Sequence, residues 1–285
     1  MEGQKQNPIL LRRKQEMILR CLIQVLFFLL APSVFSSAFA GVKEVFSAFS
    51  SGALLEWSAF TAILVLVLGF TVVFGRFFCG YACAFGALGD WIYALSAFIQ
   101  KKCHRRLPKL PVKVQRGLQW VKFAVLAVIL LLCVLGKQEF VNGNSPWTVF
   151  SRLRSGHGVP AGYGAAIALL VVILLGMAVQ ERFFCQFLCP MGAIFSLLPV
   201  LPTGQLRRAE DGCLAGCSAC EKNCPVTLKL ERNSLRSGEC VSCGRCGNTC
   251  PRENIATCFG KLRGNEWWFV LARAAALLAG IWLVQ

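Results

Sequence analysis

The chain contains the stretch Cys240-Val241-Ser242-Cys243-Gly244-Arg245-Cys246-Gly247-Asn248-Thr249-Cys250-Pro251. Its cysteines follow the spacing C-x2-C-x2-C-x3-C-P, which is the bacterial pattern for 4Fe–4S ligation. A tight loop wraps three thiolates around one cubane, and its backbone N–H groups point at the sulfurs and offset the negative charge of the cluster. The fourth cysteine lies beyond that loop and ligates the other cluster, while the proline ends the turn.

A second run of this kind lies upstream, with one extra residue in its first gap: Cys213-x3-Cys217-x2-Cys220-x3-Cys224-Pro225. Crosswise ligation predicts that the fourth cysteine of each run serves the cluster of the other run. The first predicted cluster therefore takes Cys213, Cys217, Cys220 and Cys250. The second takes Cys240, Cys243, Cys246 and Cys224.

Two alternatives compete with iron–sulfur ligation. Paired C-x2-C motifs also build zinc ribbons, but a zinc site needs only four ligands and no Cys-Pro ending. A chain with 16 cysteines could also be a secreted disulfide framework. The metal-ligand spacing of eight cysteines, together with basic flanks that indicate a reducing cytoplasmic side, weighs against disulfides.

The composition indicates a membrane protein. Of the 285 residues, 56% are hydrophobic, and the mean hydropathy of +0.59 is higher than that of most soluble domains. The net charge is +16 although only 15% of the residues are charged. Because the basic residues form blocks between apolar runs, rather than one face of a soluble fold, we expect a lipid bilayer and no nucleic acid as partner.

Five apolar stretches approach the roughly 20 residues that cross a bilayer. They are Ile18–Ala40, Trp57–Phe74, Leu118–Gly136, Ala161–Ala178 and Trp267–Val284. Arg273 lies inside the fifth stretch, so it either snorkels to the inner surface or faces the protein interior. A helix lying on the membrane surface is the alternative for this last stretch.

The first stretch has two interpretations. Its basic flank and the sequence Ala38-Phe39-Ala40 are like those of a secretory signal peptide. We expect an uncleaved anchor instead, and the topology of the remaining chain is the same in both cases.

Charge asymmetry sets the expected orientation in the cytoplasmic membrane. With the N-terminus inside, residues 1–20, 76–117 and 182–263 place five, eight and eleven Lys or Arg on the inner side. The outer side then has four, in the loops expected at Gly41–Glu56 and Lys137–Pro160. This bias follows the positive-inside rule and places both the N-terminus and the cysteine-rich segment in the cytoplasm.

The membrane part contains an internal repeat. The segment Arg76-Phe77-Phe78-Cys79-Gly80-Tyr81-Ala82-Cys83 recurs, at an offset of 106 residues, as Arg182-Phe183-Phe184-Cys185-Gln186-Phe187-Leu188-Cys189. Two intervening crossings give both copies the same orientation, so each unit is a pair of helices that ends in a cysteine motif at the inner surface. Such duplications usually pack around an axis along the membrane normal, with a shared site between them.

The repeated cysteines are a second candidate site. If helical, each pair shares one face, and the repeat brings together the thiols of Cys79, Cys83, Cys185 and Cys189. Four thiolates suit a further iron–sulfur cluster or a soft metal such as Cu(I) or zinc. Ordinary buried thiols, thiol exchange or the lining of a quinone site are the alternatives. Arg76 and Arg182, beside these motifs, either offset thiolate or cluster charge or anchor the inner surface.

Other cofactors find no support in the sequence. Cys103-His104 lacks the upstream cysteine of a C-x-x-C-H motif, and neither histidine, His104 or His157, lies in an apolar helix, so we expect no haem. No Walker loop or Rossmann fingerprint occurs, so we expect no nucleotide. The cysteines outside the motifs are interpreted as packing or surface thiols: Cys21, Cys103, Cys133 and Cys258.

Together these features predict an all-α polytopic membrane bundle of four to five transmembrane helices, built on the parallel two-helix repeat, with a small cytoplasmic α+β two-cluster ferredoxin domain. The expected boundaries are 1–204 for the membrane domain, 205–262 for the ferredoxin-like domain with its two 4Fe–4S clusters, and 263–285 for a C-terminal transmembrane or interfacial helix.

This order of motifs resembles the NapH, NosR and MauN group of membrane polyferredoxins, and is closest in layout to NapH over roughly residues 10–258. Cys185, Cys189 and Pro190 match the CxxxCP motif of that group, whereas Ala84 replaces the proline after Cys83. The resemblance implies electron transfer between the quinone pool or a cytoplasmic donor and a membrane or periplasmic redox partner. That partner would be another electron-transfer subunit, such as a periplasmic flavin or haem protein.

The same resemblance makes the chain an electron-transfer subunit of an oxidoreductase, such as a quinol dehydrogenase component, with quinone as a further ligand. Two other functions remain open. The chain could be an assembly factor that reduces or delivers metal, as CcoG-like relatives do, or a redox-sensing membrane regulator.

Overall fold

The computed structural model describes residues 8–52, 54, 57–105, 107–108, 110–154, 156, 158–159, 161–201, 205–208, 213–214, 216–228, 238–259, 262–263 and 266–284. Helices dominate this part of the chain, as the apolar composition predicts. The first half contains α1 (Pro8–Leu30), α2 (Val34–Ser51), α3 (Ala59–Phe74), the π-helix η1 (Phe78–Ala82), α4 (Ala84–Lys102), α5 (Val112–Leu118) and α6 (Val121–Val134).

The second half contains mostly short elements on both sides of one longer apolar helix, and it ends in a long helix. They are α7 (Gln138–Gly143), α8 (Pro146–Arg154), the 3-10 turn η2 (Ala161–Tyr163), α9 (Gly164–Val179), α10 (Phe183–Phe187), α11 (Pro190–Leu197), β1 (Gln205–Arg208), α12 (Ala219–Lys222), α13 (Arg245–Thr249), β2 (Ile255–Phe259), β3 (Leu262–Arg263) and α14 (Glu266–Val284).

The helices are compatible with a membrane protein. Within the described residues, the continuous helix Val112–Val134 and α14 are long and apolar enough to cross a bilayer, and the bent pair α1–α2 makes a third candidate. The helices α3 and α9 are apolar but have only 16 residues each. Four to five crossings therefore remain a prediction.

The first apolar stretch is not one straight helix. The helices α1 and α2 meet at an angle of 61° across a break that contains Pro32, and a proline removes a helical hydrogen bond and clashes with the preceding turn. Helix α2 then continues to Ser51, so the prediction of an outer loop from Gly41 onward is wrong for Gly41–Ser51. Ala38 and Phe39, from the signal-like sequence, are buried within α2.

The second outer segment is also more structured than expected. Helices α7 and α8 occupy most of the interval from Lys137 to Pro160, which we expected to be a loop. Trp147 and Val149 of α8 are buried, and the Trp147 ring packs against Phe35 and Phe39. Aromatic burial against α2 explains why a short segment with low apolar content still folds. His157 and Pro160 lie outside the described residues.

The cysteine-rich segment forms a small α+β unit. Strands β1, β2 and β3 make an antiparallel sheet in that order, with Leu206 opposite Thr257 and Cys258 opposite Arg263. Because β3 spans the predicted boundary between residues 262 and 263, the unit extends at least to Arg263. The other predicted boundary, at residue 204, lies outside the described residues.

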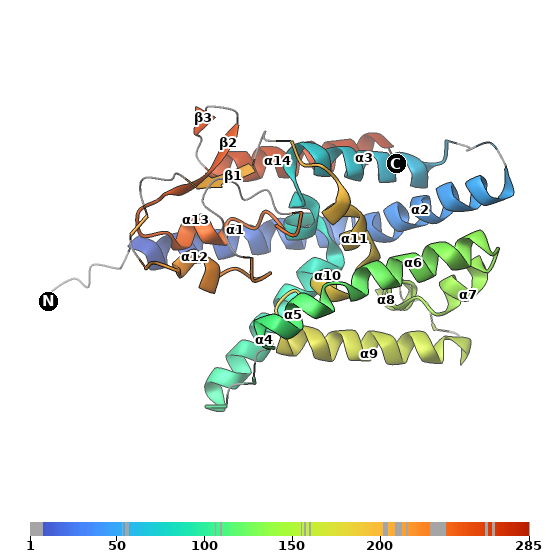
Figure 1. Ribbon diagram of the computed structural model, residues 1–285, viewed down its shortest axis with the longest axis horizontal. Coiled ribbons are helices and arrows are strands. Elements are labelled where there is room, and N and C mark those ends of the chain that lie inside the picture. The colour runs from blue at the N-terminus through green and yellow to red at the C-terminus, as the bar shows by residue number, and fades with distance from the viewer. Residues whose placement is uncertain are drawn as a thin grey trace, which may run out of the picture.

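The two parts of the molecule are packed together rather than joined by a free linker. Figure 1 shows the strands, α12 and α13 gathered around the N-terminal end of α1, while α2, α3, α6 and α9 extend away from them. Helix α13 packs on α1, and α14 contacts both β2 and α3. Arg273 of α14 is buried with its guanidinium 5.0 Å from the Phe77 ring, so this charge faces the protein interior.

The repeat is visible as two similar units. Each has an apolar helix (α3 or α9), a short helical segment (η1 or α10) and a following helix (α4 or α11). Helix α4 packs on α1 and on α9 of the other unit, whereas α11 packs on α6. The short segments η1 and α10 lie at the centre and carry the first cysteine of each motif.

Candidate functional site

One group of four thiols combines cysteines from both ferredoxin-like runs. Cys240 and Cys243 come from the loop that leads into α13, Cys246 lies in α13, and Cys224 follows α12. Each thiol lies close enough to the other three to interact electrostatically with them. Burial and these neighbours raise the pKa of Cys240 to about 12 and that of Cys246 well above its usual range. A cationic core bound among them would favour the thiolates, so the group fits an iron–sulfur cluster.

A second group of thiols lines a pocket in the same ferredoxin-like unit. Its walls contain the thiols of Cys213, Cys217, Cys220 and Cys250, together with Arg208. Arg208 donates its Nε–H to the Cys213 sulfur at 3.0 Å. Donors aimed at sulfur stabilise the charge of a thiolate-bound cluster.

Asn254, directly before β2, contacts two of these thiols. Its backbone N–H donates to the Cys250 sulfur at 3.4 Å, and its side-chain Nδ2 donates to the Cys213 sulfur at 3.5 Å. One residue thus connects the first cysteine of one run with the last cysteine of the other. The fold brings the two groups together in the crosswise sets that the sequence analysis assigned to two clusters.

The third group joins the two membrane repeats. Electrostatic interactions connect every pair among Cys79, Cys83, Cys185 and Cys189, and each of these side chains is at most 6% exposed. Burial raises the pKa of Cys79, Cys83 and Cys189, and the neighbouring thiols raise it further. The fold therefore assembles one four-thiol site from motifs that are 106 residues apart.

The CxxxC motifs are not continuous helices, contrary to one expectation from the spacing. Cys79 and Cys185 lie in the short helical segments, but Cys83 and Cys189 have extended backbone and are the N-caps of α4 and α11. The Gly192 N–H donates to the Cys189 sulfur at 3.2 Å. A sulfur at a helix N-terminus meets free backbone N–H groups, which favour its thiolate form.

Pro190 follows one N-cap directly and Ala84 follows the other. A proline is well suited to the first helical position because its fixed φ matches the helix. The N–H that it lacks would have no hydrogen-bond partner within the helix at this position. The break is nevertheless the same in both repeats, so the replacement of proline by Ala84 leaves the motif geometry intact.

Two fully buried arginines cross between the repeats. A Cβ on Gly86 of the first repeat would lie 2.6 Å from Nη1 of Arg182, and a Cβ on Gly192 of the second repeat would lie 2.9 Å from Nη2 of Arg76. Each guanidinium therefore rests on the other repeat's motif, and both glycines leave the necessary space. The arrangement has an approximate two-fold relationship.

Each buried arginine has a carboxylate partner. Arg182 donates from Nη2 to Asp90 at 2.6 Å, and Arg20 also donates to this Oδ2 atom at 2.6 Å. Arg76 donates to Glu239 at 3.2 Å, and Lys122 pairs with the other oxygen of Glu239. Although burial opposes ionisation, Arg182 and Arg20 hold the pKa of Asp90 below its ordinary value.

The membrane motif directly touches the ferredoxin-like loop. A Cβ on Gly80 would lie 2.4 Å from the carbonyl oxygen of Val241, so only glycine allows this approach. The Tyr81 hydroxyl donates to the Cys243 carbonyl at 3.3 Å. Arg182 interacts electrostatically with both Cys185 and Cys243. One guanidinium therefore lies close to a membrane thiol and to a thiol of the ferredoxin-like unit.

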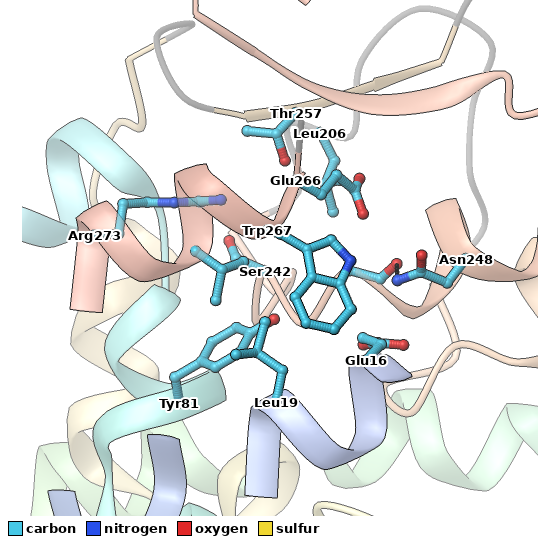
Figure 2. Close-up of a pocket in the computed structure, with 12 residues that line it drawn as sticks. Glu16, Leu19, Tyr81, Leu206, Ser242, Asn248, Thr257, Glu266, Trp267 and Arg273 are labelled. Atoms are coloured by element: carbon cyan, nitrogen blue, oxygen red, sulfur yellow. Dashed lines mark hydrogen bonds between the residues drawn. The ribbon is translucent and has the colours of Figure 1, made fainter. Parts of the chain in front are cut away.

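Figure 2 shows a pocket at this junction, with the Trp267 indole between the carboxylates of Glu16 and Glu266. The remaining space is about 20 Å³, which is room for roughly one water molecule. Burial raises the pKa of Glu16, and its Oε1 atom has no hydrogen-bond partner. Since Ser242 and Gly244 also line this pocket, it borders the loop that carries Cys243.

No three His, Cys, Asp or Glu side chains in the described part of the chain converge as a single-ion site would require. Zinc and copper sites need their ligands about 2 Å from one ion. An iron–sulfur cluster is larger and holds its thiolates further apart.

Several functional residues were missed by the sequence analysis. Asp90, Glu239, Arg20 and Gln24 form or extend the buried ion pairs, and Gln24 donates to Asp90 at 2.6 Å. Lys122 belongs to the same set, because it pairs with Glu239. The available signal was the rarity of acids, since the chain has 14 Asp and Glu and Asp90 lies within an apolar helix.

Comparison with known proteins agrees with the duplicated architecture. The family model described as a 4Fe-4S binding domain matches residues 55–105 and 163–204. Each match covers one unit with its CxxxC motif, and both lie outside the eight-cysteine segment.

Three relatives illustrate the similarity. An uncharacterized protein of Methanocaldococcus jannaschii is 28% identical over 235 residues, covering 82% of this chain and 84% of that protein. The ferredoxin-type protein NapH of Haemophilus influenzae is 26% identical over 66% of this chain and 64% of NapH. The methylamine utilization ferredoxin-type protein MauN of Methylobacillus flagellatus is 27% identical over 61% of this chain and 57% of MauN. No solved structure matches the chain.

Proposed function

We propose that the chain, which is similar to the NapH- and MauN-type ferredoxin-type proteins, is a membrane protein that relays electrons through two 4Fe–4S clusters. One cluster is held by Cys213, Cys217, Cys220 and Cys250, and the other by Cys224, Cys240, Cys243 and Cys246. Bound clusters supply one-electron redox chemistry. The chain's own residues fix the positions of the clusters and tune their potentials by burial and hydrogen bonds to sulfur.

The observation that carries this proposal is the crosswise assembly of the thiols. Cys224 joins the three thiols of the second run, and Cys250 joins the three thiols of the first. A zinc ribbon or a set of ordinary core cysteines has no reason to exchange its fourth member between two runs. The exchange is the arrangement that two adjacent clusters require.

The membrane part supplies the place where electrons enter or leave. The ferredoxin-like unit is expected on the cytoplasmic face of the inner membrane, next to basic segments. Its partners would be the quinone pool or a cytoplasmic donor on one side, and a membrane or periplasmic redox protein on the other. The contact between Gly80 and Val241 supports a route through the membrane motif rather than around it.

The test is to purify the protein anaerobically and to measure iron, sulfide and electron paramagnetic resonance spectra. We expect iron and sulfide in equal amounts, with at least roughly eight irons per chain. The variants Cys217→Ser and Cys250→Ser should remove the same spectroscopic signal, and Cys224→Ser and Cys243→Ser should remove the other.

Cys258→Ser is the matched control, because Cys258 lies in β2 of the same unit but belongs to neither group. It should keep both signals. Zinc in place of iron, or Cys250→Ser removing the signal that Cys243→Ser removes, would contradict the proposed ligand sets.

The donor is tested separately. Anaerobic addition of a short-chain quinol analogue should reduce at least one cluster if the quinone pool is the donor, and only a cytoplasmic reductant should do so otherwise. Stoichiometric copper exchange at the membrane thiols, without cluster reduction by either donor, would favour metal delivery over electron transfer.

A further inference from the structure

We propose that Cys79, Cys83, Cys185 and Cys189 hold one iron–sulfur cluster shared by both membrane repeats, and that Arg76 and Arg182 are its buried counter-charges. This inference rests on the proposed electron-transfer function and adds a third redox centre to it. The two cysteine motifs are then halves of a single site, rather than two separate sites or a set of core thiols.

The first argument is an excess of buried positive charge on each side of the thiols. On one side, Arg182 and Arg20 share the single carboxylate of Asp90. On the other, Arg76 and Lys122 share the single carboxylate of Glu239. Among these paired groups, each side therefore has two cations for one carboxylate, while Glu16 also interacts electrostatically with Arg20, and Arg245 with Asp90.

Buried charge is costly unless it is compensated nearby. The four cations that make up this excess are each at most 5% exposed, so water does not compensate it. Four thiolates around a core of charge 2+ have a net charge of 2−, which is opposite in sign to this excess. Four neutral thiols, or two disulfides, would leave that excess unopposed.

The second argument concerns guanidinium donors that have no oxygen or nitrogen acceptor. Nε and Nη2 of Arg76, and Nε of Arg182, are buried and donate to no such atom. Sulfur is within reach instead, because Arg76 interacts with Cys79 through a side-chain hydrogen bond and Arg182 interacts with Cys185 in the same way. Arg76 also interacts electrostatically with Cys185 and Cys189. Guanidinium donors that face sulfur fit an anionic cluster, whose sulfur atoms accept hydrogen bonds.

The third argument is the reciprocal geometry. Gly86 and Gly192 stand at equivalent positions, and each lacks the Cβ that would collide with the arginine of the other repeat. Both motifs also break at the second cysteine, so that Cys83 and Cys189 lie at helix N-termini. Two equal halves that each supply two thiolates and one cation form a four-ligand site at their junction.

The position of this centre suits a redox relay. Arg182 is beside Cys185 and Cys243, and Arg76 donates to Glu239, the residue directly before Cys240. The second ferredoxin-like group is therefore the immediate neighbour of the membrane thiols. An electron that leaves one centre can enter the other without a change of partner protein, and no proton transfer is needed to balance the step.

The first experiment counts iron in the intact, anaerobically purified protein. We expect roughly twelve irons for a third cubane, or roughly ten for a 2Fe–2S centre. Cys189→Ser should lower the iron content by that third-centre share and leave both ferredoxin signals intact. Cys133→Ser is the matched control, because Cys133 is an equally buried thiol of α6 outside the group.

The second experiment tests the counter-charges. Arg182→Gln and Arg76→Gln should each shift the midpoint potential of the third centre to a more negative value, because removal of a cation disfavours the added electron. Arg208→Gln, next to Cys213, should instead shift the potential of the first ferredoxin cluster. Arg182→Lys should restore part of the shift, which a purely structural role would not predict.

The outcomes separate this inference from the proposed function. Roughly eight irons with both ferredoxin signals at full strength, or one zinc per chain at the membrane thiols, would overturn the third centre and leave the relay intact. The absence of every iron signal from the wild-type protein would overturn both the third centre and the proposed relay. Unchanged potentials in both arginine variants would remove the counter-charge role.

Discussion

Arg182 and Asp90 form a buried ion pair, with 2.6 Å between Nη2 and Oδ2, although 92 residues separate them in the sequence. Arg182 comes from the second repeat and Asp90 from the helix that follows the first motif. The pair therefore ties the two repeats together at the place where their cysteines meet. Arg20 and Gln24 of α1 donate to the same carboxylate, so a third helix is fixed there as well.

Asp90→Asn should strongly destabilise the membrane part. The change leaves Arg182 and Arg20 buried without a counter-charge, and breaking a buried pair in this way costs about 3–5 kcal/mol. The expected result is a clear fall in the unfolding temperature in detergent, measured by circular dichroism. Glu139→Gln, at an exposed position of α7, is the control and should leave the temperature unchanged. An Asp90→Asn protein as stable as the wild type would show that the pair is not needed.

Gly80→Ala should separate the membrane motif from the ferredoxin-like loop. The new Cβ would lie 2.4 Å from the Val241 carbonyl oxygen, which is backbone and cannot move aside cheaply. We expect loss or broadening of the cluster signal that depends on Cys243, measured by electron paramagnetic resonance. Gly69→Ala is the matched control, since no atom lies within 4 Å of its added Cβ. In helix α3 that change should stabilise by up to about 1 kcal/mol, and equal behaviour of the two variants would refute the prediction.

Glu16→Gln should stabilise the protein at neutral pH, and the gain should shrink as the pH falls. Burial raises the pKa of Glu16 above its ordinary value, so the folded state prefers the protonated carboxyl. Stability from this preference is complete below the ordinary pKa and is lost as the pH rises through the folded-state pKa. The glutamine variant is neutral throughout, so its advantage is largest above both values. The difference in unfolding temperature between variant and wild type, measured at several pH values, checks this; a difference independent of pH would contradict it.

Cys103 should react with a membrane-impermeant maleimide only in inverted vesicles. It is exposed at the end of α4, within the segment 76–117 that carries eight Lys or Arg and is expected in the cytoplasm. The background is a Cys21→Ser variant, because Cys21 is also exposed. A cysteine introduced by Lys137→Cys should show the opposite pattern and react in right-side-out vesicles. Labelling of both positions from the same side would refute the proposed topology.

Local patterns in the sequence were sufficient to predict which cysteines lie together in the fold. The spacing of Cys240, Cys243 and Cys246 describes a loop that depends only on neighbouring residues, and the crosswise sets follow from having two such loops. The apolar lengths likewise predicted helices where α3, α6, α9 and α14 lie. The predicted loops were less accurate, because α2, α7 and α8 are stabilised by burial against distant segments.

The sequence by itself determined which thiols are candidate cluster ligands, since ligand spacing and the offset of the repeat are properties of the chain. Only the tertiary structure decided how buried charge is compensated around them. Asp90 and Glu239 are ordinary acids in the sequence, and their partners lie 92 and 163 residues away. The physical reason is that an ion pair depends on burial and distance in space, which no local pattern encodes. The meeting of Arg76 and Arg182 with the opposite repeats is fixed by helix packing in the same way.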